Sequence, residues 1–154
     1  MYKKILVPLD GSELAECSLE HVKAIASGCN VAEVVLIRVL EPVSGVSELA
    51  ARMPDEWLKN VDSEHRAGIK SYLTRVAAKL NNAGISAQTV IAEGNAADSI
   101  LEYIDNNDID LVIMSTHGRS GLARWAFGSV ADRVVKYSHV PVLVISPHAF
   151  GVDK

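Results

Sequence analysis

The feature that most constrains this chain is a set of short, almost uninterrupted runs of valine, isoleucine and leucine. Typical examples are Val34-Val35-Leu36-Ile37 and Leu111-Val112-Ile113-Met114. A strand with one face in water alternates apolar and polar residues, whereas a strand covered on both faces is apolar throughout. The runs therefore predict a parallel sheet with helices on both faces. The predicted strands are Lys4–Leu9, Glu33–Leu40, Asp110–Ser115 and Val140–Ser146, with a fifth, Ser86–Ala92, that alternates more and is expected near a sheet edge.

Apolar residues at helical spacing fill the intervals between these runs. They predict a first helix around the stripe from Leu14 to Ile25, a long helix from about Asp55 to Asn82, a third helix after Asn95 and a fourth near Ser129. Strands and helices thus alternate, which predicts a doubly wound, three-layer α/β/α fold with right-handed crossovers. We expect one domain over residues 1–147 and a loose tail over residues 148–154.

Residues with capping chemistry agree with these helix boundaries. Asn95 precedes the third helix, with Asp98 three residues later. Ser129-Val130-Ala131-Asp132 has the pattern of a capping box in which Ser129 is the N-cap. Gly84 is placed to end the long helix.

The overall composition narrows the classes of function. The chain has 154 residues, 49% of them apolar, and a formal net charge of −4. This size can bury a core without disulfides or metals, and an acidic chain is unlike a general nucleic-acid binder. No apolar run reaches the roughly 18 residues that a membrane-spanning helix needs. Cys17 and Cys29 form no CxxC pair, so we expect reduced thiols in a cytoplasmic protein.

Two strand ends carry residues that could hold a ligand. Open parallel sheets bind ligands beyond the carboxyl ends of their strands, where the strand order reverses. The first strand leads into Asp10, which could accept a hydrogen bond from a ribose hydroxyl, help to hold a divalent cation, or cap the first helix. The fourth strand leads into a loop that contains His117. His117 could act in catalysis, although a loop histidine bonded to the backbone is the more common role.

The loop after the fourth strand has the composition of a phosphate site. Gly118, Gly121 and Gly128 allow a ligand to approach the backbone closely. The helix that starts near Ser129 offers unpaired N–H groups and the positive end of its dipole, and Arg119 adds a positive charge. Each feature also has a plainer interpretation, because glycines are common in turns, Ser129 could serve only as a helix cap, and arginines are often solvated.

Several motifs with more specific chemistry do not occur in the sequence. There is no GxxxxGK[ST] P-loop and no GxGxxG dinucleotide fingerprint. There is no HExxH pattern or Cys/His cluster for a metal, and no GxSxG elbow of a serine hydrolase.

The loop and strand residues together resemble the signature of ATP-binding universal stress proteins. That signature is G-x-x-G, nine residues, and then G-S or G-T. Here it reads Ser115-Thr116-His117-Gly118, nine residues and Gly128-Ser129, with serine in place of the first glycine. The opening Lys3–Ser12 and the ending Val140–Ile145 are also similar to that family. Serine would be strained where a glycine backbone conformation is required, and tolerated where only a small side chain is required.

The resemblance implies a Rossmann-like sheet with strand order 3-2-1-4-5 and an adenine-nucleotide site beside the first and fourth strands. It implies that ATP or AMP binds there, with Mg²⁺ or Mn²⁺ held through the phosphates. It also implies a homodimer through Val140–Ile145, which would otherwise be an uncovered apolar sheet edge. The implied contacts are Pro8, Leu9, Asp10, the Val39 backbone, Met114 and Ser115 for adenine and ribose, and Gly118, Arg119, Gly128, Ser129 and Val130 for the phosphates.

Three functions are compatible with the sequence. The favoured one is a dimeric, nucleotide-binding stress-response regulator with slow or no hydrolysis and an unidentified protein partner. The second is an ATPase or nucleotide-dependent transferase that uses His117 or Asp10. The third is an interaction module of the same family that binds no nucleotide, which the serine at position 115 would favour.

Overall fold

Strands and helices alternate along the part of the chain that the structure, a computed structural model, describes: residues 1–42, 51–116 and 128–146. The strands are β1 (Lys4–Pro8), β2 (Glu33–Leu40), β3 (Ala87–Glu93), β4 (Leu111–Ser115) and β5 (Val142–Ile145). The helices are α1 (Glu13–Glu16), α2 (Ser18–Gly28), α4 (Asp55–Asn82), α5 (Ala96–Asn106) and α6 (Ser129–Tyr137). All five predicted strands are present, with ends that differ from the prediction by a residue or two. The predicted tail over residues 148–154 lies outside the described residues.

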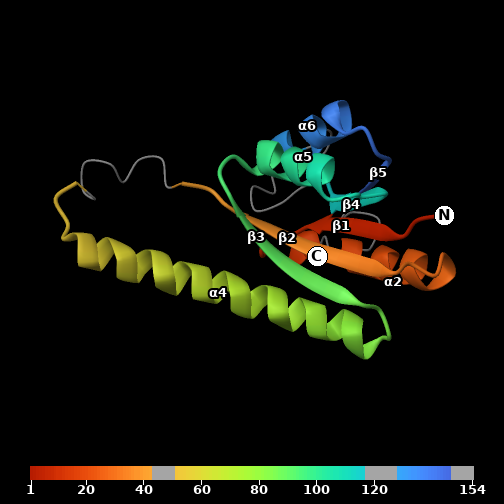
Figure 1. Ribbon diagram of the computed structural model, residues 1–154, viewed down its shortest axis with the longest axis horizontal. Coiled ribbons are helices and arrows are strands. Elements are labelled where there is room, and N and C mark those ends of the chain that lie inside the picture. The colour runs from red at the N-terminus through yellow and green to blue at the C-terminus, as the bar shows by residue number, and fades with distance from the viewer. Residues whose placement is uncertain (43–50, 117–127, 147–154) are drawn as a thin grey trace.

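The five strands form one parallel sheet in the order β3-β2-β1-β4-β5 (Figure 1). This confirms the fold class and the strand order that the family resemblance implied. The chain builds the sheet outward from β1 to β3, and then crosses to the other side of β1 to add β4 and β5. The strand order therefore reverses between β1 and β4. β3 lies at an edge, as its alternating sequence predicted.

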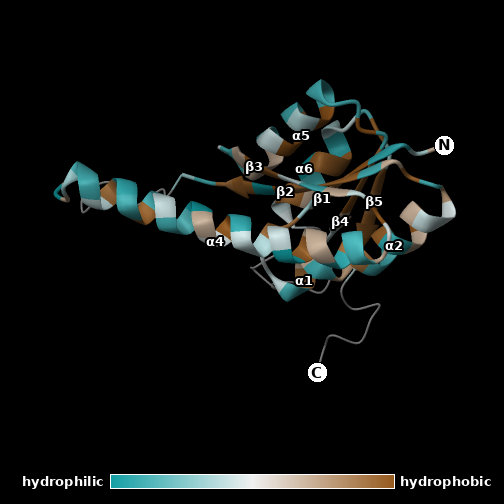
Figure 2. Cartoon of the chain, turned by 60° about the horizontal axis from the view of Figure 1, so that its bottom comes forward, coloured by the Kyte–Doolittle hydropathy of each residue, from teal (hydrophilic) through white to brown (hydrophobic). Residues whose placement is uncertain are grey.

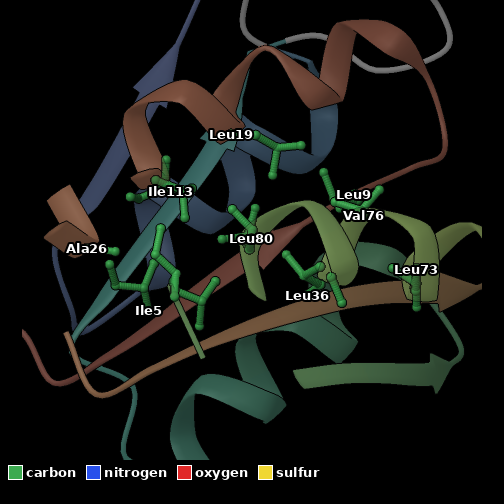
Figure 3. Close-up of a cluster of buried hydrophobic side chains, with 14 of the residues drawn as sticks. Ile5, Leu9, Leu19, Ala26, Leu36, Leu73, Val76, Leu80 and Ile113 are labelled. Atoms are coloured by element: carbon green, nitrogen blue, oxygen red, sulfur yellow. The ribbon is translucent and has the colours of Figure 1, made fainter. Parts of the chain in front are cut away.

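Helices cover both faces of this sheet, which explains why its inner strands are almost entirely apolar. α1, α2 and α4 pack on one face, and α5 and α6 pack on the other (Figure 1). Successive strand residues alternate between the two layers, so that Ile5 and Val7 face the first layer and Leu6 faces the second. Figure 3 shows the first layer, in which side chains of β1, β2 and β4 meet those of α2 and α4. Those labelled there include Ile5, Leu19, Ala26, Leu36, Leu73, Val76, Leu80 and Ile113.

The first predicted helix is two helices, α1 and α2, which meet at Cys17. The Ser18 side chain is fully buried, and its hydroxyl donates to the carbonyl oxygen of Ala15 at 2.8 Å. The N–H of Cys17 reaches back three residues, to the carbonyl oxygen of Leu14 at 3.4 Å. A serine hydroxyl that bonds a carbonyl of the preceding turn competes with the regular helical pattern. The prediction of one continuous helix was wrong at this one position, although Cys17 keeps helical backbone angles (φ −59°, ψ −23°).

The long helix α4 has the bounds that its apolar stripe predicted, and Gly84, with φ +79°, follows its end as expected. Its buried residues all lie in its second half: Ile69, Leu73, Val76, Ala77 and Leu80. The first half extends beyond the sheet (Figures 1 and 2). The side chains of Trp57 and Val61 in this half are exposed. None of the helices in the described ranges is long and apolar enough to cross a membrane.

Candidate functional site

A cavity of about 570 Å³ opens at the carboxyl ends of β1, β2 and β4, beside the start of α6. This is the place where the strand order reverses and where open α/β sheets bind ligands. Gly118 and Arg119, and also His117, lie outside the described residues. The other predicted contact residues all line this cavity: Pro8, Leu9, Asp10, Val39, Met114, Ser115, Gly128, Ser129 and Val130.

The backbone of Val39 faces the end of β1 because hydrogen bonds alternate in direction along β2. Even-numbered residues of β2 bond to β3, as in the Val34 N–H that donates to Ser86 at 2.8 Å. Odd-numbered residues bond to β1, as in the Ile37 carbonyl oxygen that accepts from the Leu9 N–H at 2.9 Å. β1 ends at this point, so the N–H and C=O of Val39 are directed past its last residue. One donor and one acceptor side by side can bind the edge of a purine base.

β4 ends in Ser115, whose backbone is that of an ordinary strand. Among the described non-glycine residues, only Asn30 and Asp108 have a positive φ. Serine is therefore not strained where the family signature has glycine. One residue further on, the carbonyl oxygen of Thr116 accepts from the Gly128 N–H at 2.7 Å, which joins the end of β4 to the start of α6.

The N-terminus of α6 forms one wall of the cavity and has no side-chain cap. Its N-cap is Gly128, whose carbonyl oxygen accepts from the Asp132 N–H at 2.9 Å. Ser129 is consequently the first helical residue, and the prediction that it caps the helix was wrong. The first N–H groups of a helix have no partner within the helix and lie at the positive end of its dipole. An anionic group in the cavity can accept hydrogen bonds from them.

Asp10 lines the cavity from the end of β1 and is held by a tight turn. Its Oδ1 accepts from the Ser12 N–H at 2.9 Å and from the Ser12 hydroxyl at 2.5 Å. The Ser12 hydroxyl oxygen accepts in turn from the Ala15 N–H at 3.1 Å, which makes Ser12 the N-cap of α1. The alternative in which Asp10 itself caps this helix was therefore wrong. A carboxylate in this position can accept a hydrogen bond from a sugar hydroxyl.

One wall of the cavity, to which α4 contributes, was not predicted from the sequence. This wall includes Ala15, Arg38, His65 and Ile69. Arg38 could have been identified from the sequence as a candidate site residue, because it is a charged residue inside an apolar strand. His65 and Ile69 could not, since the sequence of a helix does not show which end of the sheet the helix crosses.

Ion pairs fix α4 against α1 beside this wall. The Glu16 carboxylate accepts from Arg75 at 3.2 Å and from Lys79 at 3.1 Å. Burial raises the pKa of Glu16, but the hydrogen bonds and positive charges of Lys79 and Arg75 outweigh it, so the pKa is lowered overall. Both basic side chains are about half exposed, so each pair adds little stability. For the site, the consequence of these ion pairs is that they connect α4 to α1 beside the cavity.

Comparison with known proteins gives one consistent result. The model of the universal stress protein family matches residues 1–146. Universal stress protein MJ0577 of Methanocaldococcus jannaschii is 31% identical, over 94% of this chain and 95% of that protein. The solved structure of MJ0577 has a TM-score of 0.81 to this one and covers 95% of this chain and 96% of its own.

Two further solved structures have the same fold and hold nucleotides. A universal stress protein in complex with cAMP is 20% identical, with a TM-score of 0.68 and coverage of 95% of this chain and 98% of its own. A family protein of Arabidopsis thaliana with AMP bound is 18% identical, with a TM-score of 0.64 and coverage of 94% and 91%. At these identities the likeness concerns the fold alone. The family match over nearly the whole length is what decides membership, and this chain belongs to the universal stress protein family.

Proposed function

We propose that this protein binds an adenine nucleotide, ATP or AMP, in the cavity beyond β1, β2 and β4. The observation that carries the proposal is that three different polar groups meet at this one cavity. They are the uncapped N-terminus of α6, the backbone edge of Val39 and the carboxylate of Asp10. These groups match the phosphates, the base and the ribose of a nucleotide. Two proteins of the same fold hold AMP and cAMP, which supports the choice of adenine.

The cavity wall suggests a role for each predicted contact. The base would lie on Pro8 and Leu9, with its edge on the Val39 backbone. The ribose would lie beside Asp10, Met114 and Ser115. The phosphates would lie on Gly128, Ser129 and Val130, with Gly118 and Arg119 added from the loop outside the described residues.

The proposed role of the nucleotide is regulatory. Asp10 is hydrogen-bonded to Ser12 and lies at the end of β1, where the ribose would bind. The phosphates would lie at α6, away from this carboxylate. Hydrolysis should therefore be slow or absent. Phosphate release at a steady rate, reduced by Asp10→Ala or His117→Ala, would contradict this and favour an ATPase.

Among the described residues, no group of three or more His, Cys, Asp or Glu side chains could hold a metal. Mg²⁺ or Mn²⁺ is proposed to bind through the phosphates of the nucleotide. Titration of ATP with and without Mg²⁺ tests this, and an affinity that does not change would contradict it.

The proposal includes a homodimer through Val140–Ile145. β5 is an edge strand of the sheet, and its Val142, Leu143 and Val144 are only half-buried. Pairing this edge with a second copy would cover it. Light scattering at micromolar concentration should give twice the mass of one chain, and a monomer would contradict the pairing. We place the dimer in the cytoplasm, which agrees with the free thiols of Cys17 and Cys29.

The decisive experiment for the nucleotide is direct. The protein is purified without added nucleotide and denatured, the released molecules are identified by mass spectrometry, and ATP and AMP are titrated by calorimetry. Gly128→Val should abolish binding because it places a branched side chain at the cavity wall. Gly28→Val is the matched control, because Gly28 has open space around it and lies outside the cavity. Absence of both retained and titrated nucleotide would refute the proposal and favour an interaction module that binds none.

A further inference from the structure

Arg38 is a charged residue in the middle of the apolar strand β2 and is 8% exposed. Its neighbours at alternate positions, Leu36 and Leu40, belong to the layer of α1 and α4, so its side chain leaves the sheet on that face. Arg38 also lines the cavity. A guanidinium at this position is an exception among the aliphatic side chains around it in β2.

The guanidinium lies directly against the backbone of Gly11. A Cβ atom placed on Gly11 would be 2.5 Å from Nη1 of Arg38, closer than Cβ atoms come to their neighbours, and 3.4 Å from its Cζ, which is ordinary van der Waals contact. Gly11 also has φ +86°, a conformation that L-residues rarely adopt. The positive φ is what favours glycine here, and a side chain at this position would also displace the guanidinium of Arg38.

Gly11 is the middle residue of the turn that holds Asp10. The residue after it, Ser12, donates both of its hydrogen bonds to Oδ1 of Asp10 and caps α1. A side chain that packs against Gly11 therefore affects the position of the Asp10 carboxylate. Arginine suits this contact because its guanidinium is flat and rigid, whereas the lysine ammonium is a compact charge on a flexible stem.

We propose that Arg38 is a positioning residue that holds the Asp10 turn in place and thereby makes the site select ribonucleotides over deoxyribonucleotides. This inference rests on the proposed adenine-nucleotide function. A carboxylate that accepts from a ribose hydroxyl loses that bond when the hydroxyl is missing. The preference for a ribonucleotide depends on the Asp10 carboxylate remaining within hydrogen-bond distance of the ribose hydroxyl. The contact between Arg38 and Gly11 would keep the carboxylate there.

The test compares Kd values for ATP and for its analogues that lack the 2′ or the 3′ hydroxyl. The unaltered protein should bind ATP about tenfold to a hundredfold more tightly than one of these analogues. In Arg38→Met and in Gly11→Ala this preference should fall to roughly a third or less, because either change breaks the same contact from opposite sides. Arg38→Lys keeps the charge and the aliphatic stem, and should also lose part of the preference. If Arg38→Met does not fold, Arg38→Lys decides by the same ratio.

A double variant separates positioning from a general effect on folding. If Arg38 acts through Asp10, then in an Asp10→Asn background Arg38→Met should change the preference no further. Lys23→Met is the control, because Lys23 pairs with Glu20 within α2, lies outside the cavity and should leave the preference unchanged.

The possible results separate this inference from the proposed function. ATP binding with a ribose preference that survives Arg38→Met, or with no ribose preference at all, would overturn the inference and leave the proposed function standing. Absence of ATP binding by the unaltered protein would overturn both.

Discussion

Replacing Ser12 by alanine should destabilise the protein by about 2.5 kcal/mol, because one hydroxyl makes two hydrogen bonds. Its oxygen accepts from the Ala15 N–H as the cap of α1, and its hydrogen goes to Oδ1 of Asp10. Loss of an N-cap costs about 1 kcal/mol. A hydrogen bond to a charged group contributes about 1.5–3 kcal/mol, and the lower value applies here. The reason is that Asp10 is only part-buried and keeps its bond from the Ser12 N–H.

Asn95→Ala is the matched control for this prediction. Asn95 caps α5 by accepting from the Asp98 N–H at 3.2 Å, without a carboxylate partner of the kind that Ser12 has. Its loss should cost about 1 kcal/mol. Urea unfolding at one fixed protein concentration measures both changes, and the concentration is fixed because the stability of the proposed dimer would depend on it. In melting temperature the expected losses are about 5–10 °C for Ser12→Ala and about 2–4 °C for Asn95→Ala.

Equal losses for the two variants would refute the reasoning, since the excess assigned to Ser12 is its bond to Asp10. A double variant locates that excess. In an Asp10→Asn background, Ser12→Ala should cost only about as much as a cap, roughly 1 kcal/mol.

Three further predictions concern stability in the same assay. Glu16→Gln should lose up to about 1 kcal/mol near pH 7 and almost nothing near pH 3. Folding lowers the pKa of Glu16 from 4.5, so Glu16 contributes to the free energy of unfolding above that pH and loses this contribution as the pH falls through its pKa in the folded state. An equal loss of stability at both pH values would contradict this. Leu80→Ala should cost about 3–4 kcal/mol, because Leu80 is fully buried, and a loss under about 1 kcal/mol would be inconsistent with that burial. Gly84→Ala should cost about 1 kcal/mol because of the positive φ alone, since the space around Gly84 is open. Gly68→Ala on α4 should instead stabilise the protein by up to about 1 kcal/mol. Effects of the same sign would show that φ does not determine the effect of these substitutions.

Features with local causes could be predicted from the sequence. The bounds of β2 and α4, the cap at Asn95 and the helix stop at Gly84 all depend on residues within one or two turns of each other. Two local predictions were wrong in detail. The first helix is interrupted at Cys17, next to a buried Ser18 whose hydroxyl donates to the carbonyl oxygen of Ala15. The helix α6 has Gly128 rather than Ser129 as its N-cap, and the Gly128 N–H donates to the carbonyl oxygen of Thr116.

The sequence by itself determined that the chain forms a parallel sheet covered on both faces, because apolar periodicity reports how many faces of a strand are buried. It also placed Asp10 and Ser129 at the ends of elements where open α/β sheets in general bind ligands. Only the tertiary structure decided that Arg38, His65 and Ile69 join them around one cavity. The physical reason is that side chains alternate along a strand, so the sequence shows on which face of the sheet a side chain lies. Which residues it meets on that face depends on how a helix and a turn from distant parts of the chain pack there.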